Sequence, residues 1–218
     1  KRQIESYLAL KYGITVAHDY FSGDGTTLWN STTNAAYHNN VAGVGRDDAS
    51  ALNQQKSKSI HAGAAVTIDK GAAFGTDKSV IIWGHDGGIG TSNNITAPYV
   101  LRTNRIWKTA VTGAPGTASF SIDLTALGFS AFGIASDYAL LQDANTDFSS
   151  GTTAHTTGAS ITAGVVTFTG VTFTNGNFFS VAVPNLIQPA PGGVMGACFW
   201  VRADAGVTGT TSVTNWAD

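Results

Sequence analysis

The chain has 218 residues, of which 43% are hydrophobic and only 12% are charged, with a formal net charge of −2. This balance excludes a nucleic-acid-binding surface, which needs clustered Lys and Arg, and it excludes a disordered chain, which is poor in apolar residues. No apolar run reaches the length of about 18 residues that suggests a membrane-spanning helix. Thr, Ser, Asn, Gly and Ala stand where a cytosolic protein carries Lys and Glu, so we expect an extracellular or cell-surface protein.

The N-terminal residues 3–12 are predicted to form a helix that ends at Gly13, a residue that favours the left-handed conformation of a helix C-terminus. Its apolar and partly apolar positions follow the spacing of one helical face: Ile4, Tyr7, Leu8, Lys11 and Tyr12. A helix of about three turns is not stable alone, so we expect it to dock on another part of the protein. Residues 14–40 are predicted to be a loop with one or two short strands.

From residue 41 onward the pattern is that of β-strands. We expect strands at residues 41–46, 53–60, 64–69, 79–84, 99–112, 117–124, 139–142, 165–168 and 178–183. Apolar and polar residues alternate in several of them, as in Phe120, Ser121 and Ile122, which is the pattern of a strand with one buried face. Glycine-rich turns separate the strands. The fold class we predict is all-β: an antiparallel, jelly-roll-like β-sandwich with a short N-terminal helix and a C-terminal extension strand.

The composition changes near the C-terminus and predicts the domain boundaries. Residues 1–14 contain the helix, residues 15–184 the sandwich, and residues 185–193 a linker rich in Pro and Gly. Residues 194–218 are too few for a β domain. They contain one strand-like apolar run, Ala197-Cys198-Phe199-Trp200-Val201, and we expect them to open a following module or to act as a donor segment.

Both ends of the chain resemble pieces of one known module. Residues 2–15 resemble the closing segment of a concanavalin-A-like, laminin-G-type sandwich, and residues 199–207 with 213–218 resemble its opening strands. Three internal stretches, 41–59, 105–116 and 140–149, are similar to the β-rich domain between such modules in large secreted surface proteins of Bacteroidota-type bacteria. The resemblance implies a multi-domain adhesin or surface-layer component exported by the type IX route.

The resemblance leaves two explanations for the chain ends. The sequence is either a section of a longer repeating chain, or its ends each complete a fold in a neighbouring subunit. An added strand can satisfy an exposed sheet edge, and a head-to-tail contact of that kind builds a filament. The expected partners are therefore neighbouring domains or identical subunits, through the N-terminal helix and the C-terminal strand. Glycans remain an alternative partner, and no nucleic acid or membrane span is expected.

The densest charged group is Arg46-Asp47-Asp48, which resembles an active site at first sight. A glycosidase needs two positioned carboxylates, and the only glutamate is Glu5. Adjacent residues of a strand point to opposite faces, so Asp47 and Asp48 cannot flank one substrate there. We therefore predict an Arg46 ion pair or a turn cap, and a protein that is not an enzyme.

The run Asp143-Ala144-Asn145-Thr146-Asp147 places oxygen-bearing side chains at alternate positions. Ca²⁺ is a hard cation that takes such ligands, so Asp143, Asn145 and Asp147 are candidate calcium ligands. The alternative is an Asx turn, in which these side chains accept hydrogen bonds from nearby backbone. Related domains carry an acidic loop here, so the resemblance favours calcium, the one cofactor we consider.

Other candidate site residues are few. The five histidines are scattered and lack a metal-binding motif, and Cys198 lies in an apolar run without an activating base. Trp83 and Trp107 follow apolar residues and are expected in the core. Trp29, in a polar stretch, is the predicted ligand-facing aromatic residue. Our functional prediction is a structural or adhesive module, with an accessory carbohydrate-binding module as the alternative.

Overall fold

The computed structural model describes residues 1–129 and 133–184. The predicted C-terminal extension strand, the linker at 185–193 and the run that contains Cys198 lie outside these residues. The predicted helix is confirmed as α1 (Arg2–Tyr12), and Gly13 ends it in the left-handed conformation at φ 64°. A Cβ atom on Gly13 would lie 2.3 Å from the carbonyl oxygen of Lys58, so glycine is required both by the backbone angle and by the close approach.

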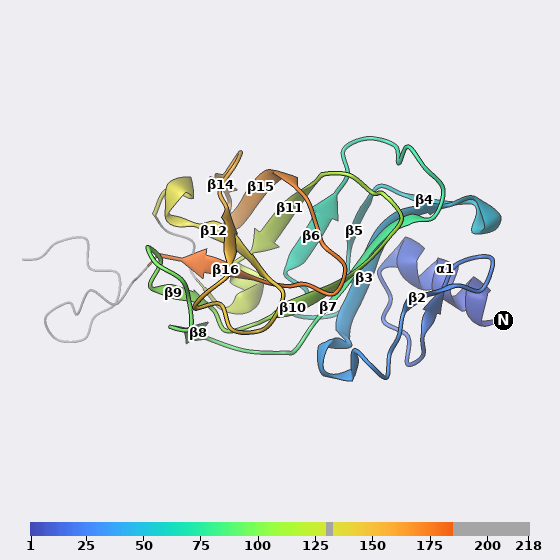
Figure 1. The fold of residues 1–218 in the computed structure, drawn as a ribbon, viewed down its shortest axis with the longest axis horizontal. Coiled ribbons are helices and arrows are strands. Elements are labelled where there is room, and N and C mark those ends of the chain that lie inside the picture. The colour runs from blue at the N-terminus through green and yellow to red at the C-terminus, as the bar shows by residue number, and fades with distance from the viewer. Residues whose placement is uncertain (130–132, 185–218) are drawn as a thin grey trace, which may run out of the picture. The chain divides into compact units, whose positions relative to one another are not determined.

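The described residues form two main antiparallel sheets and one small hairpin (Figure 1). The larger sheet, of nine strands, contains β3 (Asn39–Asp47), β4 (Leu52–Gln54), β7 (Ser79–His85), β8 (Thr91–Ser92), β9 (Leu101–Thr103), β10 (Trp107–Thr112), β12 (Ala139–Asp143), β13 (Thr153–His155) and β16 (Phe178–Val183). The smaller sheet, of five strands, contains β5 (Lys56–Lys58), β6 (Val66–Asp69), β11 (Ala118–Asp123), β14 (Ser160–Thr162) and β15 (Val165–Val171). The hairpin is β1 (Tyr20–Phe21) with β2 (Thr27–Trp29).

Short 3₁₀ turns complete the described elements: η1 (Ala35–Tyr37), η2 (Asp48–Ser50), η3 (Thr125–Leu127) and η4 (Ala135–Asp137). The predicted all-β, antiparallel sandwich is confirmed. The main core lies between the two sheets, where Trp83, Trp107 and Phe179 of the larger sheet join Phe120 and Phe168 of the smaller one in a single buried cluster. Trp107 stacks on Phe179 with ring centroids 5.5 Å apart, which adds a specific geometry to the apolar burial.

Strand β7 has both faces buried. Ile81 and Trp83 point into the core between the sheets, whereas Val80 and Ile82 point to the opposite face. There they pack against Leu10 of α1 and the β1–β2 hairpin. Because neighbouring strand residues alternate between faces, an uninterrupted apolar run marks a strand that is covered on both sides. The helix and hairpin are the cover of this second face.

Two predicted strands each divide in the structure. Residues 53–60 divide into β4 and β5, which belong to different sheets, because the chain crosses between the sheets at Gln55. Residues 99–112 divide into β9 and β10, with the break at residues 104–106. The short strands β8, β13 and β14 were not predicted, since two or three residues carry no readable alternation. In the described part of the chain, α1 is neither long nor apolar enough to cross a membrane.

His85, the last residue of β7, is only 5% exposed. Its Nδ1 accepts the Gly87 N–H at 2.9 Å, so the ring proton lies on Nε2, which is buried without a partner. Burial lowers the pKa of His85 from 6.5 to about 4; the charge of Arg105 lowers it further and Asp86 opposes both. The imidazole is therefore neutral in the folded protein, and it forms a T-shaped pair with the Trp107 ring, with ring centroids 6.1 Å apart.

This burial predicts a loss of stability in acid. Between pH 6.5 and about 4 the unfolded chain binds a proton at His85 that the folded protein does not, so the free energy of unfolding falls as the pH falls through this window. The full effect is on the order of 3 kcal/mol. Urea unfolding should show a smaller loss for His85→Asn, whose amide oxygen can still accept the Gly87 N–H. Identical pH profiles for the two proteins would contradict the buried neutral imidazole.

Candidate functional site

The helix α1 turns its large apolar residues to the solvent. Ile4 is 66% exposed, Leu8 41% and Tyr12 54%. They recur every four residues and so form one stripe along the helix, which we call the outer face of α1. Ile60, 68% exposed, lies near the C-terminal end of α1, where its N–H donates to the Gly13 carbonyl at 3.0 Å.

The buried face of α1 consists mainly of small residues instead. Ser6, Ala9 and Leu10 are buried, and Leu10 fits against β3 because Gly43 leaves room for it. A Cβ atom on Gly43 would lie 2.6 Å from Leu10 Cδ2. Of the helical face that the sequence marks, Tyr7 packs partly against the body, whereas Ile4, Leu8 and Tyr12 are exposed to the solvent. The sequence did contain a signal for the buried face. Positions 6, 9, 10 and 13 also lie on one helical face, but three of their four residues, Ser6, Ala9 and Gly13, are small.

Lys11 lies at the edge of the outer face. Its Nζ donates to the Tyr7 hydroxyl at 2.9 Å and lies 5.9 Å from the centre of the Tyr12 ring. The hydrogen bond and the charge interaction with Tyr7 raise the pKa of Lys11. The outer face is thus apolar along its centre and positively charged at its rim.

The Arg46-Asp47-Asp48 group lies beside α1, at the end of β3. Arg46 forms a two-pronged ion pair with Asp48, with Nε–Oδ1 at 2.7 Å and Nη2–Oδ2 at 2.8 Å. This pair lowers the pKa of the Asp48 carboxyl. Asp47, only 1% exposed, accepts the Gly23 N–H at 2.6 Å and the Ser50 hydroxyl at 2.7 Å, both at Oδ2. The predicted Arg46 ion pair is present. The alternative, a turn cap, is not formed, because no side chain caps the turn η2 that follows Asp47.

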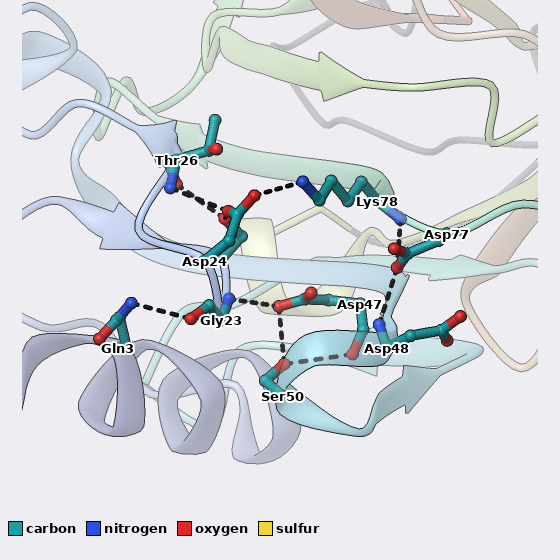
Figure 2. Close-up of polar contacts among 10 residues, drawn as sticks. Gln3, Gly23, Asp24, Thr26, Asp47, Asp48, Ser50, Asp77 and Lys78 are labelled. Atoms are coloured by element: carbon teal, nitrogen blue, oxygen red, sulfur yellow. Dashed lines mark hydrogen bonds and ion pairs between the residues drawn. The ribbon is translucent and has the colours of Figure 1, made fainter.

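These contacts extend into a closed ring that joins three loops (Figure 2). We call it the polar ring. Its members are Gly23, Asp24, Asp47, Asp48, Asp77 and Lys78. Asp77 Oδ1 accepts the Asp48 N–H at 2.7 Å, and Lys78 pairs with Asp24. That pair, with a hydrogen bond from Ser22, holds the pKa of Asp24 well below its usual range.

The helix is tied to the polar ring as well, because Gln3 Nε2 donates to the Gly23 carbonyl at 2.8 Å (Figure 2). Each carboxylate of the ring accepts N–H or O–H bonds from another loop or pairs with a cation. Asp47 Oδ1 is buried without a partner, and its burial keeps a substrate from reaching it. This arrangement therefore holds the three loops together next to α1.

Trp29 does not lie on the surface. It is 1% exposed, at the end of β2, and its Nε1 donates to His38 Nδ1 at 2.9 Å. The prediction that Trp29 faces a ligand is wrong, because no ring face is open for a sugar to stack on. The hairpin that covers β7 buries it. Trp83 and Trp107 are buried in the main core, as predicted.

The Asp143 loop is a series of Asx turns. Asp143 Oδ1 accepts the Asn145 N–H at 3.0 Å, and Asn145 Oδ1 accepts the Asp147 N–H at 2.6 Å. Asp147 Oδ1 in turn accepts from Ser149, and Asn94 donates to the same oxygen. These bonds lower the pKa of Asp147. They support the turn, while calcium binding by Asp143, Asn145 and Asp147 stays a prediction.

No three His, Cys, Asp or Glu side chains within residues 1–129 and 133–184 lie close enough together to hold a metal ion. Glu5, the one glutamate, contacts His18 Nε2 at 3.1 Å. Among the described residues, the candidate functional site is therefore the outer face of α1, together with the polar ring beside it.

A model of a family described as a domain of unknown function, DUF8202, matches residues 1–177. The chain belongs to this family. The match includes α1, the polar ring and every strand that precedes β16, so the DUF8202 domain contains the helix and the sandwich together. Neither the curated proteins nor the solved structures contain a significant match to the chain.

The neighbours Asp47 and Asp48 should differ sharply in their effect on stability. Asp47→Ala leaves the partly buried Gly23 N–H without its acceptor and takes the carboxylate acceptor from Ser50, so it should cost about 1–3 kcal/mol. Asp48→Ala removes an exposed ion pair and should cost less than about 1 kcal/mol. Urea unfolding of both variants measures the difference. Equal losses would show that Asp47 is not an anchor of the loops.

Removing divalent cations should leave the Asp143 loop intact, since its side chains already close the turns. We expect the same melting temperature with and without a chelator, and a lower one for Asn145→Ala, which removes one turn acceptor. A fall of the melting temperature in chelator that calcium reverses would establish the calcium site instead.

Proposed function

We propose that this chain is a structural and adhesive module of a secreted bacterial surface protein, joined head to tail with its neighbours through its two ends. The neighbours are identical subunits or adjoining domains. The proposal assigns no catalytic step to the chain. Its extracellular location and export by the type IX route rest on the composition and on the resemblance at the chain ends.

The observation that carries the proposal is the placement of the ends. In Figure 1, α1 lies at the right-hand end of the body formed by residues 1–184, and β16 ends at its left-hand end. The chain therefore enters this body at one end and leaves it at the other, which suits a unit in a linear array. Such a contact is heterologous, because the two surfaces differ, and it extends without closing unless a rotation makes a ring.

The body between the ends supports this role. Its core between the sheets is continuous, and a second cluster attaches α1 and the hairpin to the larger sheet. The edge strands of the two described sheets are short: β4, β5, β13 and β14 have three residues each and β8 has two. Short edges give little template for non-specific strand pairing. Association through a defined surface such as the outer face of α1 is then favoured.

A carbohydrate-binding module has less support, because its one candidate residue, Trp29, is buried. No other observation favours it over a structural role.

The proposal predicts that the purified full chain associates as its concentration rises. Sedimentation velocity should show species larger than the monomer, and electron microscopy of the same samples should show them extended in one direction. Antibodies against the chain should also label intact cells of a bacterium that produces it. A chain that stays monomeric at every concentration, and that antibodies reach only after cell lysis, would overturn the proposal.

A further inference from the structure

The outer face of α1 is an exposed apolar stripe that the packing of the described residues does not explain. A short helix gains its folding stability from the face that it buries, here Ser6, Ala9 and Leu10. Ile4, Leu8 and Tyr12 contribute little to that burial and remain exposed. Contiguous apolar patches on a protein surface mark interaction sites more often than chance exposure does.

The supporting contacts hold this face in place. Ser6 accepts the Phe21 N–H at 2.9 Å, and Gln3 donates to Gly23 at 2.8 Å. The polar ring then joins Gly23 to the loops around Asp47 and Asp77. A helix that is fixed before binding loses less conformational entropy when a partner docks.

We infer that the outer face of α1 is the acceptor surface for the apolar segment 197–201 of a second copy of this chain. This inference rests on the proposed head-to-tail function and names the contact that would produce it. The segment reads Ala197-Cys198-Phe199-Trp200-Val201, and it offers two aromatic side chains of the kind that dominate protein interfaces.

The position of this segment in the chain favours a second copy. The described body ends at Pro184, directly after β16, and 34 residues follow it. In Figure 1 the end of β16 lies at the opposite end of the body from α1. In a linear array, this end of the body faces the α1 of the next copy, which is the acceptor that the inference assigns to the segment.

Charge also fits this pairing. Arg2 and Lys11 are exposed at the rim of the outer face, and Glu5, the one acidic residue of α1, already contacts His18. The segment is followed by Arg202 and then by Asp204, and Asp218 is the other acidic residue of the 34. An acidic group just past the apolar run can pair with Lys11 while the aromatic residues pack on the stripe.

A sheet edge is a poorer acceptor than the helix. The edge strand β5 carries Lys56 and Lys58, which pair with Asp69 and Asp123 of its own sheet. Lysine on an edge strand discourages the addition of another strand. The short edge strands of the described sheets also offer few main-chain groups for strand addition, which depends on them for affinity.

The single cysteine of the chain, Cys198, allows a direct test in the full-length protein. Leu8→Cys is combined with Cys198→Ser and mixed in equal amounts with the unaltered chain under a mild oxidant. A disulfide between positions 8 and 198 requires Cα atoms within about 7 Å. The matched control is Ile89→Cys combined with Cys198→Ser. Ile89 is also an exposed apolar residue, at 80% exposure, and it is far from α1 in the sequence.

We expect at least about tenfold more mixed dimer with the Leu8→Cys chain than with the Ile89→Cys chain, because docking raises the effective concentration of the thiol pair. Equal yields would overturn the inference. So would an internal disulfide as the main product when Leu8→Cys is made with Cys198 retained, since the segment would then cover its own helix.

The two proposals can fail separately in this experiment. If sedimentation shows association while the Leu8→Cys chain gives no excess of mixed dimer, the acceptor surface is wrong and head-to-tail assembly stands. If the chain stays monomeric and neither introduced thiol traps a dimer, both fail.

Discussion

The burial of β7 on both faces is the constraint on which the rest of the structure depends. Ile81 and Trp83 need the smaller sheet opposite them, and Val80 and Ile82 need a second cover. Exposing those last two side chains would cost roughly 3–6 kcal/mol, which is a large part of the stability of a single domain. The helix and the β1–β2 hairpin are therefore part of the domain, and the extent of the DUF8202 match, residues 1–177, includes both.

Much of this fold could be predicted from periodicity. The alternation in β11 and the apolar run of β7 were readable because each follows a simple rule of one or two buried faces. The division of residues 53–60 into β4 and β5 could not be predicted, because Gln55 is a polar residue between two other polar residues. Nothing in this pattern marks the point where the chain crosses to the other sheet. The buried face of α1 was missed for a related reason: hydrophobicity ranks Leu8 above Ser6, whereas close packing of the helix on the body prefers the smaller residue.

The charged residues show what the sequence leaves open. Asp47 and Asp48 are chemically identical neighbours, yet one is buried under Gly23 and the other is exposed beside Arg46. Strand alternation predicted that they point apart, and it could not predict which of them faces the protein. That depends on the β1–β2 turn, which lies in residues 14–40, where the sequence predicts one or two short strands without fixing their positions. Trp29 was misplaced for the same reason, since its burial comes from that hairpin.

The exposed apolar residues of α1 need an explanation other than the burial of hydrophobic surface within the chain. A surface helix of a monomer gains nothing from Ile, Leu and Tyr on its outer side, and such residues lower solubility. Gln3 joins this helix to the polar ring by one hydrogen bond to the Gly23 carbonyl, and Ser6 accepts a second bond from the Phe21 N–H. Rigid placement and outward apolar residues together favour binding, since a fixed surface orders little on contact. The helix thus covers β7 with one face, and its other face is the one that we propose binds a partner.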